Sequence, residues 1–405
     1  MKRKPVRRTA NEKVIAAMAS LILFSFGMHC ILRGIVLPAV RADFGLSYTE
    51  MSGVVSVSSV GYLLMALFSA KLCERIGQKN ALSLFSAVLS ITACLIAASG
   101  TYLHLVVLFL FAGCAYGGIE CTVTAITKRY HPLDSDRAVN HVFGFYSAGS
   151  FSIALMGGWL LYRGIGWRTA YLLAAAAAAL AFFSSLRVVD AAAEAAPQVD
   201  LSDAKTLLSD RTFIVMCVST ALLSGASAAS INWMNLFLTD TVTDMTIWES
   251  SCATAFFFAW LYIGRSVISR LLARFCGVTL AIVCSLITGA VVLLVSLVDT
   301  PALMLCGIAL FGFFSACLYP LLISITNGLA PGSLIYSVTF TAISVMNFLV
   351  SYLMGVVADA YNLPGSFRFC ALLYLTAAGA VFLCRKEVLR RAGLGEAGRT
   401  NPAAG

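Results

Sequence analysis

Three charged residues stand inside long apolar stretches of the sequence: Arg33, Glu120 and Arg265. A guanidinium group binds a carboxylate or a phosphate through two parallel hydrogen bonds. A carboxyl group in a dry cavity can take up and release a proton near neutral pH as its access to water alternates. Charged groups inside a membrane are costly and commonly serve function. We therefore expect anion binding by the two arginines and proton coupling by Glu120.

Uncharged polar residues also recur at helical spacing within the apolar stretches. Side chains four residues apart share one face of a helix, as His29 and Arg33 do. We expect the solute to be bound by the following residues: Arg33, Arg265, His29, Asn232, Trp233, Asn235, Tyr319 and Asn347. For Ser, Thr and Asn, the alternative is packing between helices or a hydrogen bond to a carbonyl one turn back.

The elements that must position these residues are membrane-spanning helices. The chain has 405 residues, of which 60% are hydrophobic and only 12% charged, whereas soluble domains carry about 25% charged residues. A helix crosses the hydrocarbon core with about 20 residues. The pattern predicts an all-α integral membrane protein with twelve spans: 14–39, 50–72, 80–98, 103–127, 139–162, 168–187, 213–238, 249–272, 278–298, 302–329, 335–358 and 367–384.

The distribution of Lys and Arg predicts the orientation of these spans. With the amino terminus inside, only four of the 28 basic residues fall in outer loops, and two lie within spans. Positive residues favour the cytoplasmic side, so we expect both termini in the cytoplasm and no cleaved signal peptide. The excess of basic residues on the inner side accounts for the net charge of +9. We expect these residues to face the anionic inner leaflet of a lipid bilayer, and we do not expect nucleic acid as a partner.

One long polar break divides the chain into two sets of six spans. We expect an amino-terminal bundle at 1–187, a cytoplasmic linker at 188–212, a carboxy-terminal bundle at 213–385 and a cytoplasmic tail at 386–405. The capping-box patterns "SYTE" and "TIWE" lie 199 residues apart, and Arg75 and Arg274 share that offset. The sequence therefore predicts two pseudo-symmetric six-helix bundles, as found in secondary transporters.

The charged segment "AKLCERIGQKN" (70–80) lies between the second and third spans. It resembles the signature loop of the major facilitator superfamily, with Leu72, Glu74, Arg75, Gly77 and Lys79 at matching positions. Similar segments are "LPAVRADFGLS", "GWRTAY" and "YPLLISI". The resemblance covers essentially the whole chain. It implies transport by alternating access, with the polar stripes lining one central cavity.

The loop itself predicts a turn and a gate. Gly77 permits a tight turn between antiparallel helices. Glu74 would be costly without a partner near the hydrocarbon edge, so Arg75 or a helix amino terminus of the other half is expected to pair with it. We expect a gating motif of Glu74, Arg75, Gly77, Lys79 and Arg274. The alternative is a solvated turn that only anchors the loop inside.

Two further resemblances bear on the solute. The segment "GGIECTVTA" around Glu120 resembles the fucose permease branch, which implies proton coupling through this glutamate, although Arg33 could instead hold it in a structural ion pair. The "GR" at Gly264 and Arg265 resembles oxalate- and monocarboxylate-type members. We expect proton-coupled symport of a small organic anion or polar solute. The alternatives are a fucose permease-like sugar transporter, a drug exporter or a non-transporting membrane sensor.

Other classes of function lack their residue patterns. The four histidines have no nucleophile or metal ligands at suitable spacing, so we do not expect an enzyme, a cofactor or a metal site. Cysteines lie mostly in apolar spans, where they pack as small hydrophobic residues. We expect a monomer in the plasma membrane, more specifically a bacterial inner membrane.

Overall fold

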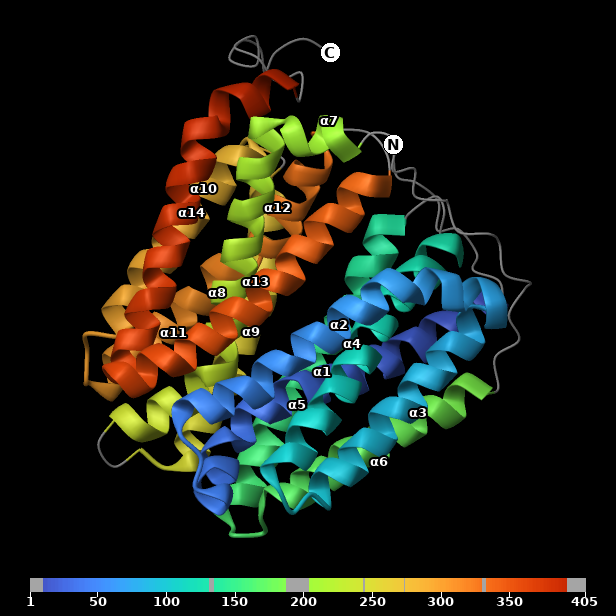
Figure 1. Ribbon diagram of the computed structural model, residues 1–405, viewed down its shortest axis with the longest axis vertical. Coiled ribbons are helices and arrows are strands. Elements are labelled where there is room, and N and C mark those ends of the chain that lie inside the picture. Colours follow the sequence, from blue (N-terminus) through green and yellow to red (C-terminus); the bar gives the residue numbers. More distant parts are fainter. Residues whose placement is uncertain are drawn as a thin grey trace. The chain divides into compact units, whose positions relative to one another are not determined.

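The structure is a computed structural model, and it describes residues 10–130, 135–186, 204–242, 245–272, 274–329 and 333–391. The linker sequence from 187 to 203 and the tail from 392 onward lie outside the described residues. The described part is almost entirely helical (Figure 1). Its helices are α1 (Ala10–Phe44), α2 (Tyr48–Ile76), α3 (Gln78–Ala97), α4 (Tyr102–Tyr130), α5 (Ser135–Tyr162), α6 (Trp167–Leu186), α7 (Ala204–Ser209), α8 (Arg211–Thr241), α9 (Ile247–Leu271), α10 (Gly277–Val295), α11 (Pro301–Ser315), α12 (Leu318–Asn327), α13 (Ser333–Ala360) and α14 (Leu363–Arg391).

Each predicted span corresponds to helix in the structure. Eleven helical stretches of the described chain are long and apolar enough, by length and composition, to cross a membrane, and α11 and α12 together form one of them. α5, which is rich in Gly and Ser, is the helix at the remaining predicted span, 139–162. The span expected at 302–329 is present at Pro301–Asn327, and its helix is interrupted at Ala316 and Cys317. The reason is Pro320, which cannot donate a backbone hydrogen bond to the preceding turn.

The helices group into two units by contact. The first unit contains α1, α3–α6, α2 from Val57 onward and α9 up to Ala255. The second contains residues 47–56 of α2, α9 from Phe256 onward, and α7, α8 and α10–α14. The expected division at the central linker therefore differs from these contact units at the first turns of α2 and α9. The predicted division of the chain into two six-helix domains stays a prediction.

Small residues let the helices of the first unit approach closely. A Cβ atom added at Gly27 of α1 would collide with the Tyr146 carbonyl of α5, and one at Gly149 with the Phe24 carbonyl. Along α6, alanines at 174, 175, 178 and 181 are buried, and Ser90 of α3 donates to the Ala175 carbonyl at 2.9 Å. Close backbone packing of this kind holds membrane helices together where apolar burial alone gives little driving force.

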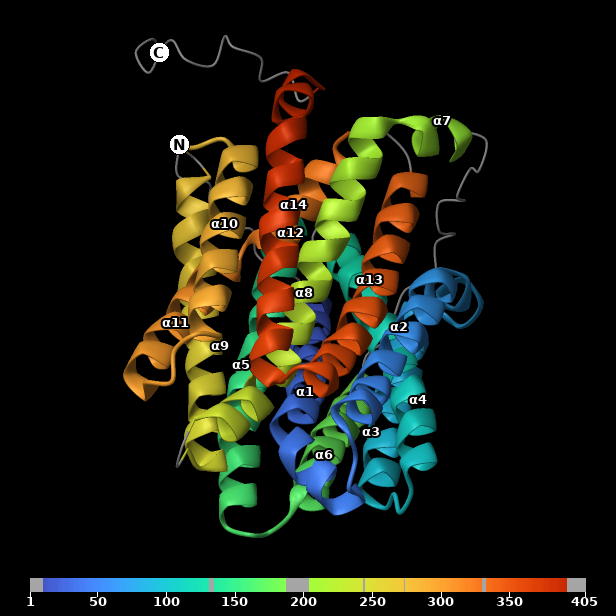
Figure 2. The same ribbon diagram turned by 60° about the vertical axis from the view of Figure 1, so that its left-hand side comes forward.

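The second unit is organised around α8, which packs against α13 and α14 (Figure 2). Asp210 caps α8 by accepting from the backbone N–H groups of Thr212 and Phe213 at 3.0 and 3.3 Å. The same carboxylate pairs with Arg391 near the end of α14. α14 ends at Arg391, so the helix runs beyond the span predicted at 367–384.

Two details support the predicted duplication, each within one unit. Arg168 at the start of α6 donates to the Ser99 carbonyl at 3.4 Å, and Arg368 at the start of α14 donates to the Ser296 carbonyl at 3.3 Å. Both capping boxes also form, with the N–H groups of Ser47 and Thr246 donating to Glu50 and Glu249 at 2.9 and 2.8 Å. The two halves thus share the same arginine–carbonyl contact and the same capping box.

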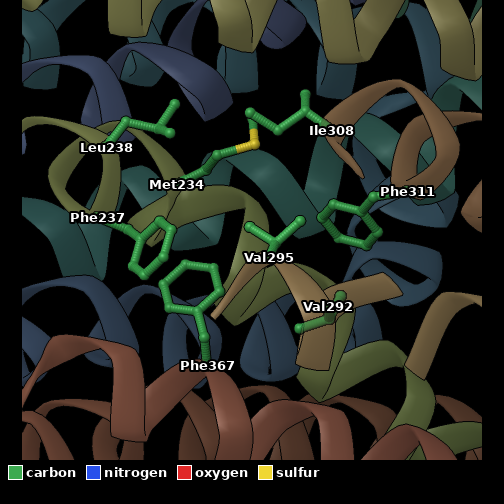
Figure 3. A pocket seen from close by; sticks show the side chains of 8 residues that line it. All are labelled: Met234, Phe237, Leu238, Val292, Val295, Ile308, Phe311 and Phe367. Carbon is green, nitrogen blue, oxygen red and sulfur yellow. The ribbon is translucent and has the colours of Figure 1, made fainter. Parts of the chain in front are cut away.

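The second unit also contains an apolar cavity between α8, α10, α11 and α14 (Figure 3). The Phe237 and Phe367 rings lie 4.2 Å apart at its edge, as measured between their centroids. Every residue that lines the cavity is apolar: Met234, Phe237, Leu238, Val292, Val295, Ile308, Phe311 and Phe367. It offers no group that could orient a polar solute, so it is not the candidate site.

Candidate functional site

In the first unit, Arg33 lies at a junction of three helices. Its Nη1 donates to the Ser58 hydroxyl of α2 at 2.8 Å. Its guanidinium carbon lies 5.8 Å from the centre of the Tyr116 ring of α4. The side chain is half-buried, so these contacts hold a cation in an apolar segment while leaving part of it accessible.

Glu120 is held by Tyr62, whose hydroxyl donates to the carboxylate. Close packing of α2 against α4 brings these side chains together. A Cβ added at Gly117 would collide with the Tyr62 carbonyl, and one at Gly113 with the Ser58 carbonyl. The half-buried carboxylate therefore has a defined neutral partner, which favours a group that can change its charge over a structural ion pair with Arg33.

His29 lies one turn before Arg33 in α1 but in the interior of the unit. It is only 2% exposed and is hydrogen-bonded to the backbone of Ala174 in α6. Its Nε2 atom has no hydrogen-bond partner among the described residues. This placement favours a role in joining α1 to α6, and a part in solute binding stays a prediction.

In the second unit, Arg265 of α9 lies beside the break between α11 and α12. Its Nε donates to the Ala316 carbonyl at 3.4 Å, and the side chain is half-buried. Two glycines bring the helices together, since a Cβ at Gly264 would collide with the Phe313 carbonyl and one at Gly312 would lie 2.5 Å from the Phe257 carbonyl. Arg265 is thus fixed at an irregular stretch of backbone inside an apolar helix pair.

The helix pairs around Glu120 and Arg265 are pseudo-symmetric. Gly113 packs on Ser58 in the first unit, and Gly312 packs on Phe257 in the second, so both residues of the pair are displaced by 199 positions. At this offset, Tyr319 is the counterpart of Glu120. It is half-buried and directly precedes Pro320, so the duplicated position carries a polar side chain in each unit.

The other predicted solute ligands belong to α8 and α13. Asn347 of α13 accepts a hydrogen bond from the Ser224 hydroxyl of α8 at 3.1 Å. Asn232 and Asn235 are 4% and 1% exposed, and Trp233 is fully buried. The Trp233 ring lies 6.1 Å from that of Tyr48, between centroids, and is covered rather than presented as an open surface for stacking.

Several other hydroxyl groups of the apolar spans bond within their own helices. Thr124 donates to the Glu120 carbonyl at 2.8 Å, and Ser344 to the Phe340 carbonyl at 2.9 Å. Ser25 and Thr239 donate to carbonyls three residues back. These contacts match the alternative of local bonding.

The loop between α2 and α3 forms the predicted turn. Gly77 alone separates the two helices and has φ of +85°, a conformation that favours glycine. Glu74 and Arg75 are exposed and Lys79 is half-buried. Arg274, between α9 and α10, is also exposed. The gating role of these residues stays a prediction.

Sequence reasoning missed Ser58, Tyr62 and Tyr116 as partners of the charged residues. Ser58 and Tyr62 are four residues apart, so their helical spacing was an available signal. Pro320 was a stronger signal for the broken helix, since proline interrupts helical hydrogen bonding. Within the described residues, no group of three or more His, Cys, Asp or Glu could hold a metal ion.

Comparison with known proteins identifies the family. The family model described as Major Facilitator Superfamily matches residues 17–349. The chain belongs to this superfamily.

Two curated relatives of this superfamily member are transporters of organic acids by name. The "Gallate transporter" of Pseudomonas putida is 25% identical over 164 residues, covering 40% of this chain and 36% of the relative. The "4-hydroxybenzoate transporter PcaK" of Acinetobacter baylyi is 28% identical over 164 residues, covering 40% and 35%. The matched segments thus span little more than a third of these relatives.

Solved structures share the fold over nearly the whole chain. A bacterial homolog to the human lysosomal transporter Spinster has a TM-score of 0.75 at 14% identity, covering 98% of this chain and 100% of that chain. The Escherichia coli fucose:proton symporter FucP has a TM-score of 0.65 at 16% identity, covering 92% and 99%. At this identity the likeness shows the major facilitator fold alone.

Proposed function

We propose that this superfamily member is a secondary active transporter that moves a small organic anion together with a proton by alternating access. The observation that carries the proposal is Arg265, a half-buried guanidinium beside a broken helix inside an apolar span. A charged group within a span is costly and commonly serves function, and a guanidinium is suited to binding a carboxylate. Arg33 provides a second half-buried cation in the other unit.

The named relatives support a carboxylate as the solute. Gallate and 4-hydroxybenzoate both carry a carboxylate on an aromatic ring, and two of the chain's relatives are named for them. A planar carboxylate matches the two-pronged donor geometry of arginine. We therefore propose aromatic or other small carboxylates as the first solute class to test.

Proton coupling is assigned to Glu120. Its carboxylate has the Tyr62 hydroxyl as hydrogen-bond donor and lies within a span. A neutral donor allows the carboxyl group to be either ionised or protonated, whereas an ion pair would hold it ionised. The proposed cycle carries solute and proton in the same direction, and both chain termini face the cytoplasm of a bacterial inner membrane. The proposed working unit is a monomer.

A neutral sugar is the second candidate. The segment around Glu120 resembles the fucose permease branch, and FucP shares the fold. The buried position of Trp233 does not favour the stacking expected for a sugar ring. The solute test therefore includes sugars as competing candidates.

The test is uptake into proteoliposomes that contain the full-length protein. Labelled 4-hydroxybenzoate, gallate, L-fucose and D-xylose are compared with and without an inward proton gradient and a protonophore. We expect gradient-stimulated uptake of a carboxylate, with at least about a tenfold loss in Arg265→Gln, since one lost charge-assisted interaction of about 1.5–3 kcal/mol corresponds to that range.

The matched control is Arg270→Gln, which removes an exposed arginine from the same helix. This variant is expected to keep wild-type uptake. Sugar uptake without carboxylate uptake would replace the anion proposal with the sugar alternative. Carboxylate uptake that is insensitive to both Arg33→Gln and Arg265→Gln would remove the arginines from the site.

A further inference from the structure

At the break between α11 and α12, the Ala316 carbonyl lacks its helical donor. In an α-helix, the N–H of each residue donates to the carbonyl four residues earlier. The donor for Ala316 would be residue 320, which is proline and has no N–H. α11 accordingly ends at Ser315, and α12 begins at Leu318. Ala316 is buried, so an unpaired carbonyl here would destabilise the fold.

Arg265 supplies the missing donor from the neighbouring helix. Its Nε–H points to the Ala316 carbonyl at a donor–acceptor distance of 3.4 Å. The packing of Gly264 on Phe313 and of Gly312 on Phe257 sets the separation of α9 and α11 at this level. Arg265 and Pro320 are therefore linked through one oxygen atom, although they lie 55 positions apart in the sequence.

The hydrogen bond is long enough to be exchanged. Its 3.4 Å distance lies beyond the usual 2.7–3.2 Å range, whereas a guanidinium–carboxylate bond is typically about 2.7–2.9 Å and roughly twice as strong as a neutral one. A carboxylate that binds side-on through Nε competes with the Ala316 carbonyl for the same donor. Solute binding would then change the backbone contact at the break.

We propose that Arg265 is a positioning residue for the α11–α12 break, and that a bound carboxylate takes over its Nε donor from Ala316. Occupancy of the site is thereby transmitted to the point where the helix is interrupted. The first half of this inference concerns the chain alone. The second half rests on the proposed function, since it requires an anionic solute at Arg265.

A double-substitution cycle tests the first half without solute. Arg265→Met removes the donor, and Pro320→Ala restores a backbone N–H for the Ala316 carbonyl. We expect Arg265→Met to lower the thermal unfolding midpoint of the purified protein by several degrees. In the Pro320→Ala background the same change is expected to cost less than half as much. Equal losses in both backgrounds would overturn the assignment.

Arg265→Lys separates this role from a general need for charge. Lysine keeps the positive charge but lacks the Nε–H in the position that reaches Ala316. We expect it to lower the unfolding midpoint nearly as much as Arg265→Met, with the loss again relieved by Pro320→Ala. A lysine variant as stable as the wild type would show that charge alone is sufficient and would contradict the hydrogen-bond role.

Cys317 provides a native reporter for the second half. It is 8% exposed and stands at the break, whereas Cys370 of α14 in the same unit is fully buried. The rate of alkylation of each cysteine by N-ethylmaleimide is followed by peptide mass spectrometry in the wild-type protein. We expect saturating 4-hydroxybenzoate to change the Cys317 rate at least about threefold and to leave Cys370 unchanged. In Arg265→Met, the Cys317 rate is expected not to respond.

The outcomes distinguish this inference from the proposed function. Carboxylate uptake that depends on Arg265, together with an unchanged Cys317 rate, would overturn the exchange and leave the function standing. If no carboxylate is bound or transported, the function fails and the exchange fails with it. The double-substitution cycle then still decides whether Arg265 supports the break.

Discussion

At the scale of single residues, the charged side chains in the spans are distinguished by their partners. Glu120 has a neutral donor, Tyr62, and Arg33 donates to a neutral acceptor, the Ser58 hydroxyl. Arg265 donates to a backbone carbonyl. A neutral donor offsets part of the cost of burying the Glu120 carboxyl without holding it ionised. These contacts are therefore compatible with residues that must bind and release a charged species in each transport cycle.

Glu120→Gln is expected to abolish stimulation of carboxylate uptake by a proton gradient. Glutamine keeps the shape and can accept from Tyr62, but it cannot carry a proton between the two sides of the membrane. The measurement compares initial uptake rates with and without the gradient. Glu249→Gln, at the capping box of α9, serves as the control and should keep the stimulation. Full stimulation in Glu120→Gln would assign the coupling to another group.

At the scale of helices, glycine contacts decide which side chains meet. Gly113 and Gly117 of α4 pack against the backbone of α2, which brings Tyr62 to Glu120 and Ser58 to Arg33. The corresponding contact of Gly312 in α11 with α9 brings Ala316 to Arg265. In both units, the candidate charged residue lies beside a closely packed pair of helices.

Gly117→Ala is expected to destabilise the protein by about 1–3 kcal/mol, the usual cost of overpacking. The added methyl group would collide with the Tyr62 carbonyl and push α2 from α4. Gly144→Ala in α5 is the control, because nothing lies within 4 Å of a Cβ at that position. Thermal unfolding midpoints of the two purified variants provide the measurement. Equal stability of both would show that the α2–α4 contact is not constrained.

Asp210 contributes a pH-dependent tie between α8 and α14. The Arg391 guanidinium holds the pKa of the Asp210 carboxyl below its usual range, and the N–H groups of Phe213 and Thr212 act in the same direction. A depressed folded-state pKa stabilises the protein above the unfolded-state value, about 3.9. This stability is lost as the pH falls through the folded-state pKa.

Asp210→Ala is accordingly expected to cost about 1 kcal/mol at pH 7, the usual worth of a helix cap. The difference between variant and wild type should shrink as the pH falls below about 4. Unfolding midpoints across pH 3–7 provide the measurement, with Asp299→Ala in an exposed loop as the control. A difference that stays constant with pH would contradict an ionised cap.

At the scale of the whole molecule, a duplicated plan with unequal polar content is the main feature. Contacts that set the fold recur in both units, as with Arg168 and Arg368. The candidate charged positions inside the spans do not recur, since the counterpart of Glu120 is Tyr319. The two units thus share one arrangement of helices, and differences at single positions give each unit a different candidate site.

The predicted orientation can be tested on the whole chain. Because the basic residues cluster on one side, a carboxy-terminal fusion to green fluorescent protein is expected to fluoresce in bacterial cells. The matching fusion to alkaline phosphatase is expected to be inactive. An active phosphatase fusion with a dark fluorescent fusion would place the carboxyl terminus outside and reverse the assignment.

Much of the fold could be predicted from the sequence, because hydrocarbon thickness sets the length of apolar helices. The helices of the spans, both capping boxes and the turn at Gly77 follow from local patterns, and the structure confirms them, with an interruption at Ala316 and Cys317. The charged candidates were also evident, since charges are rare within such spans.

The sequence by itself therefore determined the helical architecture, the family resemblance and the identity of the unusual charges. Only the tertiary structure decided their partners: Ser58 for Arg33, Tyr62 for Glu120 and the Ala316 carbonyl for Arg265. The physical reason is that local periodicity and hydropathy act within one segment. The pairing of groups on different helices depends instead on how closely their backbones pack, and here glycines set that separation.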